Sequence, residues 1–298
     1  MNERAPSTGV AARPMRPEFV RDDAAQAACL DVVEKQLTRW ERTWNQQAVR
    51  KTAILLVLIV LWQAYAVWLG KGLLFPTFTA TLAALKDGIA SGELLVRTWY
   101  SIKVLLMGYA AGIACAGVLT LLAIVSRIGN DFLETMTAMF NPLPAIALLP
   151  LALIWFGLGN GSLVFVLVHS VLWPVALNTH SGFMAVTNTL RMVGRNAGLR
   201  GPRYVLKILI PAAFGSILTG LKIGWAFSWR TLIAAELVFG VSSGSGGLGW
   251  FIYMNKNDLE IANVFAGLFM VVLIGLFVES AIFRAIEMAT VRKWGVHS

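Results

Sequence analysis

One long apolar stretch of the chain, residues 211–239, contains charged side chains. It carries Lys222, Arg230 and Glu236 among mostly apolar neighbours. Ions in such a stretch face a partner or a water-filled cavity, because apolar surroundings solvate them poorly. Two cations and one anion leave a positive surplus, so we expect the stretch to line the path of an anionic solute. The alternative is structural, with these ions paired to polar groups of a neighbouring segment or lying at the membrane surface.

Glu236 lies near the end of this stretch and precedes a glycine-rich loop. A bare carboxylate there would repel an anion, so we expect a cation or hydrogen-bond donors to hold it. Arg230 of a second copy of the chain is one candidate, since Arg230 of the same helix is six residues away and points elsewhere. The hypothesis is that Glu236 belongs to the solute path or to its gate.

A second apolar stretch, residues 162–182, contains two histidines and a tryptophan. His169, Trp173 and His180 are separated by four and seven residues, which places them roughly on one helical face. His169 is a candidate for the solute path, and the alternative is a hydrogen-bonded packing residue. Because no carboxylate or thiolate accompanies them at ligand spacing, we expect no metal site.

The motifs of nucleotide hydrolysis are absent from the sequence. No Gly-x4-Gly-Lys-Ser/Thr occurs, which excludes ATP hydrolysis by a P-loop mechanism. Since no His-Glu-x-x-His helix or paired carboxylates stand out, we expect no catalytic residue and no cofactor. Gly244, Gly246 and Gly249 have the spacing of a dinucleotide fingerprint, but they lie between two apolar stretches rather than in a strand–helix unit. We expect these glycines to allow close packing against a neighbouring helix or partner.

Residues 190–211 form a basic interruption between two apolar stretches. Five cations and no acidic residue occur there: Arg191, Arg195, Arg200, Arg203 and Lys207. Such positive loops lie on the cytoplasmic side of a membrane. Gly198 and Gly201-Pro202 divide the region into two short helices with a bend between them, and Pro211 starts the next span. The alternative is an ordinary positive loop without a partner.

The spacing of Gly198, Ile208 and Pro211 resembles the cytoplasmic signature of ABC importer permeases: Glu-Ala-Ala, three residues, Gly, nine residues, Ile-x-Leu-Pro. Ile210 replaces the leucine, and Met192-Val193-Gly194 replaces Glu-Ala-Ala, so the acidic residue of the signature is missing. Further short segments within about residues 53–295 are similar to the nitrate, sulfonate, taurine and bicarbonate branch of these permeases. They are Phe75-Pro76, Ser91-Gly92-Glu93-Leu94, Pro142 to Pro150, Ala235-Glu236-Leu237, Gly247-Leu248-Gly249 and Arg292-Lys293-Trp294-Gly295.

This resemblance implies an all-α permease of the type I ABC importer kind, with six transmembrane helices and cytoplasmic coupling helices. The implied partners are two cytoplasmic ABC ATPase subunits, an external solute-binding protein and a second permease copy, with the solute path at the homodimer interface. Region 183–207 would dock on the ATPases, which would carry out the ATP hydrolysis. The coupling residues would be Arg191, Arg195, Gly198, Arg200, Arg203 and Pro211.

Composition supports a membrane protein independently of the resemblance. The chain is 57% apolar and 14% charged, and its basic residues flank apolar runs, so a lipid bilayer explains the net charge of +9 better than nucleic acid does. Spanning a bilayer takes about 20 apolar residues. Six runs qualify: 52–69, 102–125, 138–157, 162–182, 211–239 and 261–285. Pro142, Pro144 and Pro150 predict that the third run is kinked or broken, either to line a cavity or as a kink tolerated for packing.

Loop charges predict the orientation in a bacterial inner membrane. Eighteen Lys and Arg residues fall on the side of both termini and of loops 126–137 and 183–207, against five on the other side. We therefore expect both termini to be cytoplasmic. Residues 70–101, with a helix after Pro76, and the loop 240–260 would be external. The expected divisions are a disordered tail 1–22, an amphipathic interfacial or else solvated helix 23–51, a permease domain 52–285 and a C-terminal tail 286–298.

The sequence therefore predicts the permease subunit of an ATP-driven importer for a small anionic solute, of the sulfonate, nitrate, bicarbonate or aromatic carboxylate type. A stand-alone secondary transporter or channel is the alternative. Many such folds contain internal repeats with broken helices, and no repeat is evident here. A membrane enzyme is a third class, which lacks a catalytic set.

Overall fold

The computed structural model describes residues 44–239 and 246–290, which are helical and contain no strand. The chain divides into two units within α3 (Gln47–Leu69), between Val57 and Leu58, and the sites below all belong to the second unit. The all-α class predicted from the sequence is confirmed. The expected tail 1–22 and residues 23–43 of the expected interfacial helix lie outside the described residues.

Within residues 44–239 and 246–290, four helices are long and apolar enough to cross a membrane: α3, α5 (Glu93–Val125), α8 (Asn160–Met184) and the continuous helix Ile261–Ala289. The last of these comprises α14 (Ile261–Phe277), a π-helical turn at Val278–Phe283 and α15 (Arg284–Ala289). Two bent pairs add to the four, so six spans result if each pair crosses once.

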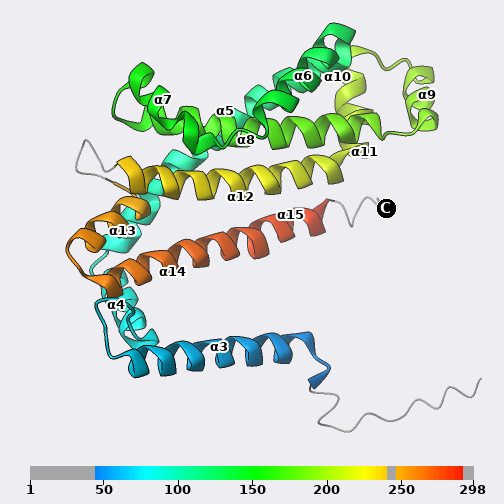
Figure 1. Ribbon diagram of the computed structural model, residues 1–298. Coiled ribbons are helices and arrows are strands. Elements are labelled where there is room, and N and C mark those ends of the chain that lie inside the picture. Colours follow the sequence, from blue (N-terminus) through cyan, green and yellow to red (C-terminus); the bar gives the residue numbers. More distant parts are fainter. Residues whose placement is uncertain (1–43, 240–245, 291–298) are drawn as a thin grey trace, which may run out of the picture. The chain divides into compact units, whose positions relative to one another are not determined.

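The first bent pair is α6 (Arg127–Phe140) with Ala145–Phe156, which contains α7 (Leu149–Phe156), at 89°. The second joins Gly201–Ala212 to α12 (Phe214–Phe239) at 77°. Figure 1 shows both bends.

Two boundaries differ from the sequence prediction. The expected cytoplasmic loop 126–137 is part of α6, whose N-terminus is capped by Ser126 Oγ accepting the Gly129 N–H at 2.9 Å. Helix α5 begins at Glu93, so residues 93–101, expected outside the membrane, continue a spanning helix. A count of consecutive apolar residues does not detect helix ends that contain charged and polar residues, such as Glu93 and Arg97 in α5. The expected helix after Pro76 is confirmed as α4 (Phe78–Ala90), which is capped by Thr77.

Helix α8 packs between α5 and α12, the two most extensive helix–helix contacts among the described residues. Small residues allow the backbones to approach closely, as is common in membrane proteins. A Cβ on Gly112 of α5 would lie 2.7 Å from Val171 Cβ, and one on Gly220 of α12 would lie 3.1 Å from the Pro174 carbonyl oxygen. Larger residues there would separate the three helices that carry the site.

At the other end of α12, a short helix α13 (Leu248–Asn257) packs against α5, α12 and α14. Leu94, Leu232 and Leu248 are fully buried in the core that joins these elements. The expected flexible loop 240–260 is therefore helical over much of its length, while residues 240–245 lie outside the described part.

Candidate functional site: a cavity at the broken helix

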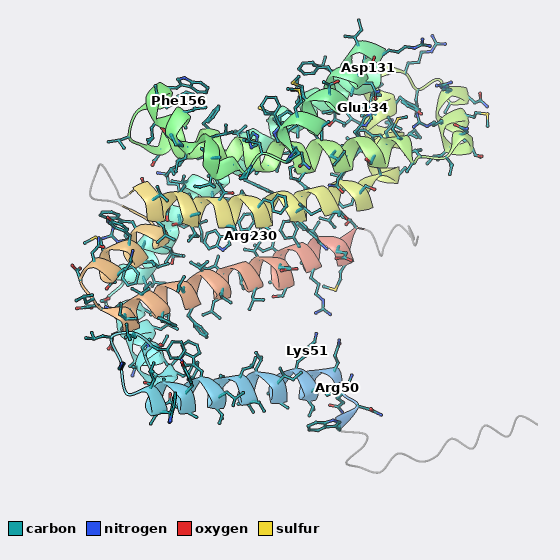
Figure 2. The ribbon with its side chains drawn as sticks, in the orientation of Figure 1. Arg50, Lys51, Asp131, Glu134, Phe156 and Arg230 are labelled. Atoms are coloured by element: carbon teal, nitrogen blue, oxygen red, sulfur yellow. The ribbon has the colours of Figure 1, made fainter. Side chains whose placement is uncertain are left out.

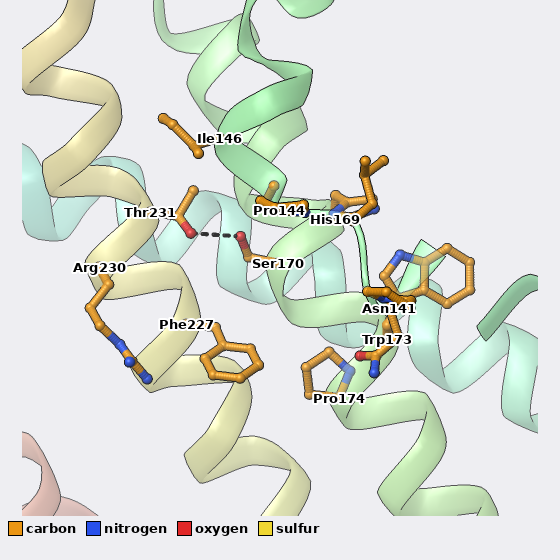
Figure 3. A pocket seen from close by; sticks show the side chains of 13 residues that line it. Asn141, Pro144, Ile146, His169, Ser170, Trp173, Pro174, Phe227, Arg230 and Thr231 are labelled. Atoms are coloured by element: carbon orange, nitrogen blue, oxygen red, sulfur yellow. Dashed lines mark hydrogen bonds between the residues drawn. The ribbon is translucent and has the colours of Figure 1, made fainter. Parts of the chain in front are cut away.

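A cavity of about 280 Å³ lies where α6 and α7 are separated by a sharp break. It is bordered by residues 141–146 of the break, by α8 and by α12 (Figure 3). Pro142 and Pro144 occupy the break, and a 3₁₀ turn at Ala145–Leu148 leads into α7. Because proline has no backbone N–H and disfavours helix before it, these residues interrupt the helix and leave space beside α8. The predicted break in the third run is confirmed.

Helix α8 contributes His169 and Trp173 to the wall of this cavity. Both ring nitrogens of His169 and the Nε1 of Trp173 are buried without a hydrogen-bond partner among the described residues. Trp173 is held by stacking on Phe140, with centroids 5.5 Å apart and rings inclined by 8°. A buried polar group without a partner costs about 1–3 kcal/mol. These nitrogen atoms are themselves inaccessible, so a polar guest in the cavity would bond to them only if the rings turned toward it.

Helix α12 contributes Arg230, whose side chain is exposed (Figure 2). Its Nε donates to the Ala226 carbonyl at 2.9 Å, and its Cζ lies 5.2 Å from the centroid of the Phe227 ring. No ion pair joins Arg230 to a carboxylate in the part of the chain that the structure describes. Ser170 Oγ donates to Thr231 Oγ1 at 3.1 Å and so connects α8 to α12. The cavity thus combines one cation with unpaired imidazole and indole nitrogens.

The other predicted path residue on α12, Lys222, does not line this cavity. Its Nζ lies 2.6 Å from Glu287 Oε2, which connects α12 to α15. Of the two cations expected beside the solute path, Arg230 lines this cavity and Lys222 does not. His180, although on the same helix as His169, lines other cavities near α6.

Glu236 is bound within its own chain by hydrogen-bond donors. Its carboxylate, 4% exposed, accepts from Ser101 Oγ at 2.9 Å and from the Gly249 N–H at 2.8 Å, and the Leu248 N–H donates to Ser101 Oγ at 2.8 Å. This carboxylate thereby caps the N-terminus of α13, where a negative charge is favoured. A Cβ on Gly249 would lie 2.6 Å from Glu236 Cβ, which confirms the expected close packing for this glycine, while Gly244 lies outside the described residues.

Within the single chain, this arrangement supplies one of the two partners expected for Glu236. Hydrogen-bond donors hold it, and no cation pairs with it among the described residues. A contact with Arg230 of a second copy stays a prediction; in the single chain the Glu236 carboxylate is buried between α5, α12 and α13 and is held by donors of its own chain.

The basic region folds as two short helices with a bend, as predicted. Helix α9 (Asn188–Asn196) ends in a pair of bonds, Gly198 N–H to Arg195 O and Leu199 N–H to Gly194 O, with Gly198 at φ 73°. This is the left-handed C-terminal motif for which glycine is preferred. Helix α10 (Gly201–Tyr204) follows and continues through a π-helical turn (Val205–Leu209) into α11 (Ile210–Ala212).

Two residues of this region differ from expectation. Pro211 lies in α11, before the bend at Ala213, rather than at the start of the span α12. Arg191 is directed back to α8, since its Nη2 donates to Phe183 O at 2.5 Å and its Nε to Val186 O at 3.1 Å. Its guanidinium adds charged donors to carbonyl groups near the C-terminal end of α8, where a cation is favoured.

With this geometry established, the chain can be compared with known proteins. Residues 108–287 match the family described as the inner membrane component of binding-protein-dependent transport systems. The chain belongs to this family. The permease is 30% identical over 247 residues to a putative ABC transporter permease of Methanocaldococcus jannaschii, with 82% of this chain and 91% of the relative covered.

Two further relatives are named for their transport systems. The nitrate import permease NrtB of Synechocystis is 28% identical over 243 residues, and the match covers 79% of this chain and 87% of NrtB. The putative aliphatic sulfonates permease SsuC of Bacillus subtilis is 27% identical over 228 residues, and the match covers 75% of this chain and 80% of SsuC. The predicted family and branch are confirmed, and the permease is a multi-pass protein of the inner membrane.

The sequence did not single out several residues of the permease that the structure brings to these sites. Asn141 lines the cavity and directly precedes Pro142, so a polar residue beside the predicted break could have been identified from the sequence as a candidate for the site. Ser101 and Thr231 carry no such signal, because serine and threonine are frequent in spanning helices. Their partners lie 135 and 61 residues away in the chain.

Proposed function

We propose that this chain is the permease subunit of an ATP-driven importer and that a small anionic solute passes the cavity beside Arg230. The observation that carries the proposal is an exposed arginine in the second half of a spanning helix, next to a cavity with unpaired His169 and Trp173 nitrogens. A solute with several oxygen atoms would accept hydrogen bonds from these groups while Arg230 balances its charge.

The exposure of Arg230 supports a solute path rather than a lipid-facing surface. Placing an arginine at the centre of the hydrocarbon costs about 3 kcal/mol, so such residues face a protein partner or a water-filled cavity. A second copy of the chain, packed with this face of α12 opposite its own, would enclose the cavity and complete the path. Nitrate and aliphatic sulfonates, for which two of the relatives are named, are oxyanions of suitable chemistry.

The proposed partners are two cytoplasmic ATPase subunits, an external solute-binding protein and the second permease copy. Region 183–207, within a permease domain of residues 52–285, would dock on the ATPases. Gly198 and Arg203 would belong to the docking segment, and Met192 and Val193, 56% and 55% exposed on α9, provide apolar contact area. Pro211 would stiffen the connection to α12.

Uptake by the reconstituted complex tests the role of Arg230. The permease is incorporated into liposomes with its ATPase and binding protein, and uptake of labelled nitrate, an alkanesulfonate, bicarbonate and an aromatic carboxylate is measured. Arg230→Gln should reduce uptake of the transported anion by at least 10-fold, whereas Arg230→Lys should retain a substantial part. Lys222→Gln is the matched control, because that cation is paired away from the cavity.

Normal uptake by Arg230→Gln would refute the assignment of the path. Uptake that persists without the ATPase would instead favour a secondary transporter or channel.

Orientation is tested by thiol labelling of intact cells in a variant lacking Cys29 and Cys115. Ser91→Cys, at the exposed end of α4, should react with an impermeant reagent added outside. Met192→Cys on α9 should react only after the membrane is permeabilised. The reverse pattern would overturn the proposal that the basic region and both termini are cytoplasmic.

A further inference from the structure

A second cavity, of about 650 Å³, lies between the C-terminal end of α5 and the α9–α10 segment. We propose that this cavity binds an anionic phospholipid, with the phosphate head group on Arg195 and Arg200 and an acyl chain along the last turn of α5. The proposal requires that the chain spans a membrane and does not depend on the solute. It gives Arg195 and Arg200 a lipid contact in place of the ATPase contact that the family resemblance implies for them.

The polar side of the cavity is positively charged. Arg191, Arg195 and Arg200 line it, and no carboxylate is among its lining residues. Arg191 is already bound to two carbonyl groups of α8, and it also borders a neighbouring cavity of about 400 Å³ together with Asp131. Within the described residues Arg195 and Arg200 have neither an ion pair nor a hydrogen bond from their side chains. These two are therefore the cations available to an anion.

Tyr204 adds a neutral hydroxyl to the residues that line this cavity. The hydroxyl of Tyr204 is buried without a partner in the described part of the chain, and Tyr204 also lines the cavity. Its ring is fixed against Gly194, where a Cβ would come within 2.9 Å of Tyr204 Cε2. A phosphate in the cavity could accept a hydrogen bond from this hydroxyl as well as from the guanidinium groups. Two cations and a neutral donor suit a phosphate group with several acceptor oxygens.

The opposite side of the cavity is apolar and belongs to a spanning helix. Leu121, Ile124 and Val125 of α5 line it, and Val125, the last residue of that helix, is 81% exposed. A spanning helix ends where hydrocarbon gives way to head groups, so this surface lies where an acyl chain meets its phosphate. A free phosphate or nucleotide would leave these side chains unused. A phospholipid uses both sides, and basic pockets at the cytoplasmic ends of spans are known lipid sites.

The face of α9 that lines the cavity is distinct from the face proposed for the ATPase. Arg191 and Arg195 are four residues apart and lie on one side of α9. Met192 and Val193 are rotated away from them by roughly a quarter to a half turn and are exposed. The lipid would therefore brace α9 from the membrane side while the other face remains free.

Lipid binding to the purified full-length permease tests the proposal. Native mass spectrometry in detergent is used to titrate phosphatidylglycerol, with phosphatidylcholine as the zwitterionic lipid and glycerol 3-phosphate as the head group alone. Phosphatidylglycerol should bind at least 10-fold more tightly than either. Replacing both Arg195 and Arg200 by glutamine should weaken its binding about 30-fold, at about 1 kcal/mol per cation. Arg203→Gln is the matched control, since Arg203 lies in the same segment but does not line the cavity.

Three outcomes would overturn the proposal. They are an equal loss with Arg203→Gln, equal affinity for glycerol 3-phosphate, and unchanged phosphatidylglycerol binding by the double variant. If that variant binds lipid normally but loses a co-purifying ATPase, the two arginines belong to the protein interface instead. If the double variant does not insert, Arg200→Gln alone is used, because this extended loop residue makes no described side-chain contact; it should weaken binding about fivefold.

Discussion

Replacing Ser101 with alanine removes the hydroxyl that joins α5 to Glu236 of α12 and to the first turn of α13. Ser101 is fully buried, so water cannot replace the lost contacts without opening the structure. The change deletes one donor to the Glu236 carboxylate and leaves the Leu248 N–H without its acceptor. We expect α13 to detach more often from α5 and α12 while the fold itself persists.

The magnitude follows from these contacts. A hydrogen bond to a charged group contributes about 1.5–3 kcal/mol, and a buried donor left unpaired costs about 1–3 kcal/mol. With partial relaxation of the small site, the net cost is about 3 kcal/mol. Since 1.4 kcal/mol is about a factor of ten, local opening of α13 should become about 100-fold more frequent.

Hydrogen–deuterium exchange of the purified permease measures this opening directly. Amides of residues 246–257 should exchange up to about 100-fold faster in Ser101→Ala, while those of α8 change little. Ser280→Ala is the control, because Ser280 Oγ is exposed and bonds only to its own helix, at Leu276 O. Exchange of residues 246–257 at the wild-type rate in Ser101→Ala would refute the view that Ser101 fastens α13.

Three further predictions address the other contacts. Glu236→Gln should raise basal ATP hydrolysis of the reconstituted complex and lower uptake, because the cap on α13 weakens; near-normal values of both would reduce Glu236 to a packing residue. Gly198→Val should abolish uptake but leave insertion intact, since a left-handed residue with a Cβ costs about 1–2 kcal/mol and distorts the end of α9; normal transport would contradict the docking role. A double-mutant cycle on Lys222 and Glu287, measured by thermal unfolding, should give a coupling energy of only about 0.5 kcal/mol, because both side chains are more than a third exposed. A coupling energy above about 2 kcal/mol would show that the ion pair is desolvated in the assembly.

The sequence by itself determined the helical class, the approximate spans, the broken third run and the two short helices of the basic region. These features depend on local signals: run length set by bilayer thickness, proline without an N–H, and glycine at positive φ at Gly198. The helical α6, expected as a loop, was missed because its polar composition hides it from a count of apolar residues.

Which charged groups meet was decided only by the tertiary structure. Lys222 pairs with Glu287, 65 residues away, and Glu236 is held by Ser101, 135 residues away. Neither pairing has a local signature, because each depends on how α5, α12, α13 and α15 approach one another. The cavity is likewise a product of packing. His169 and Arg230 were visible as polar residues in apolar helices, but the space beside them exists because Pro142 and Pro144 break the helix between α6 and α7.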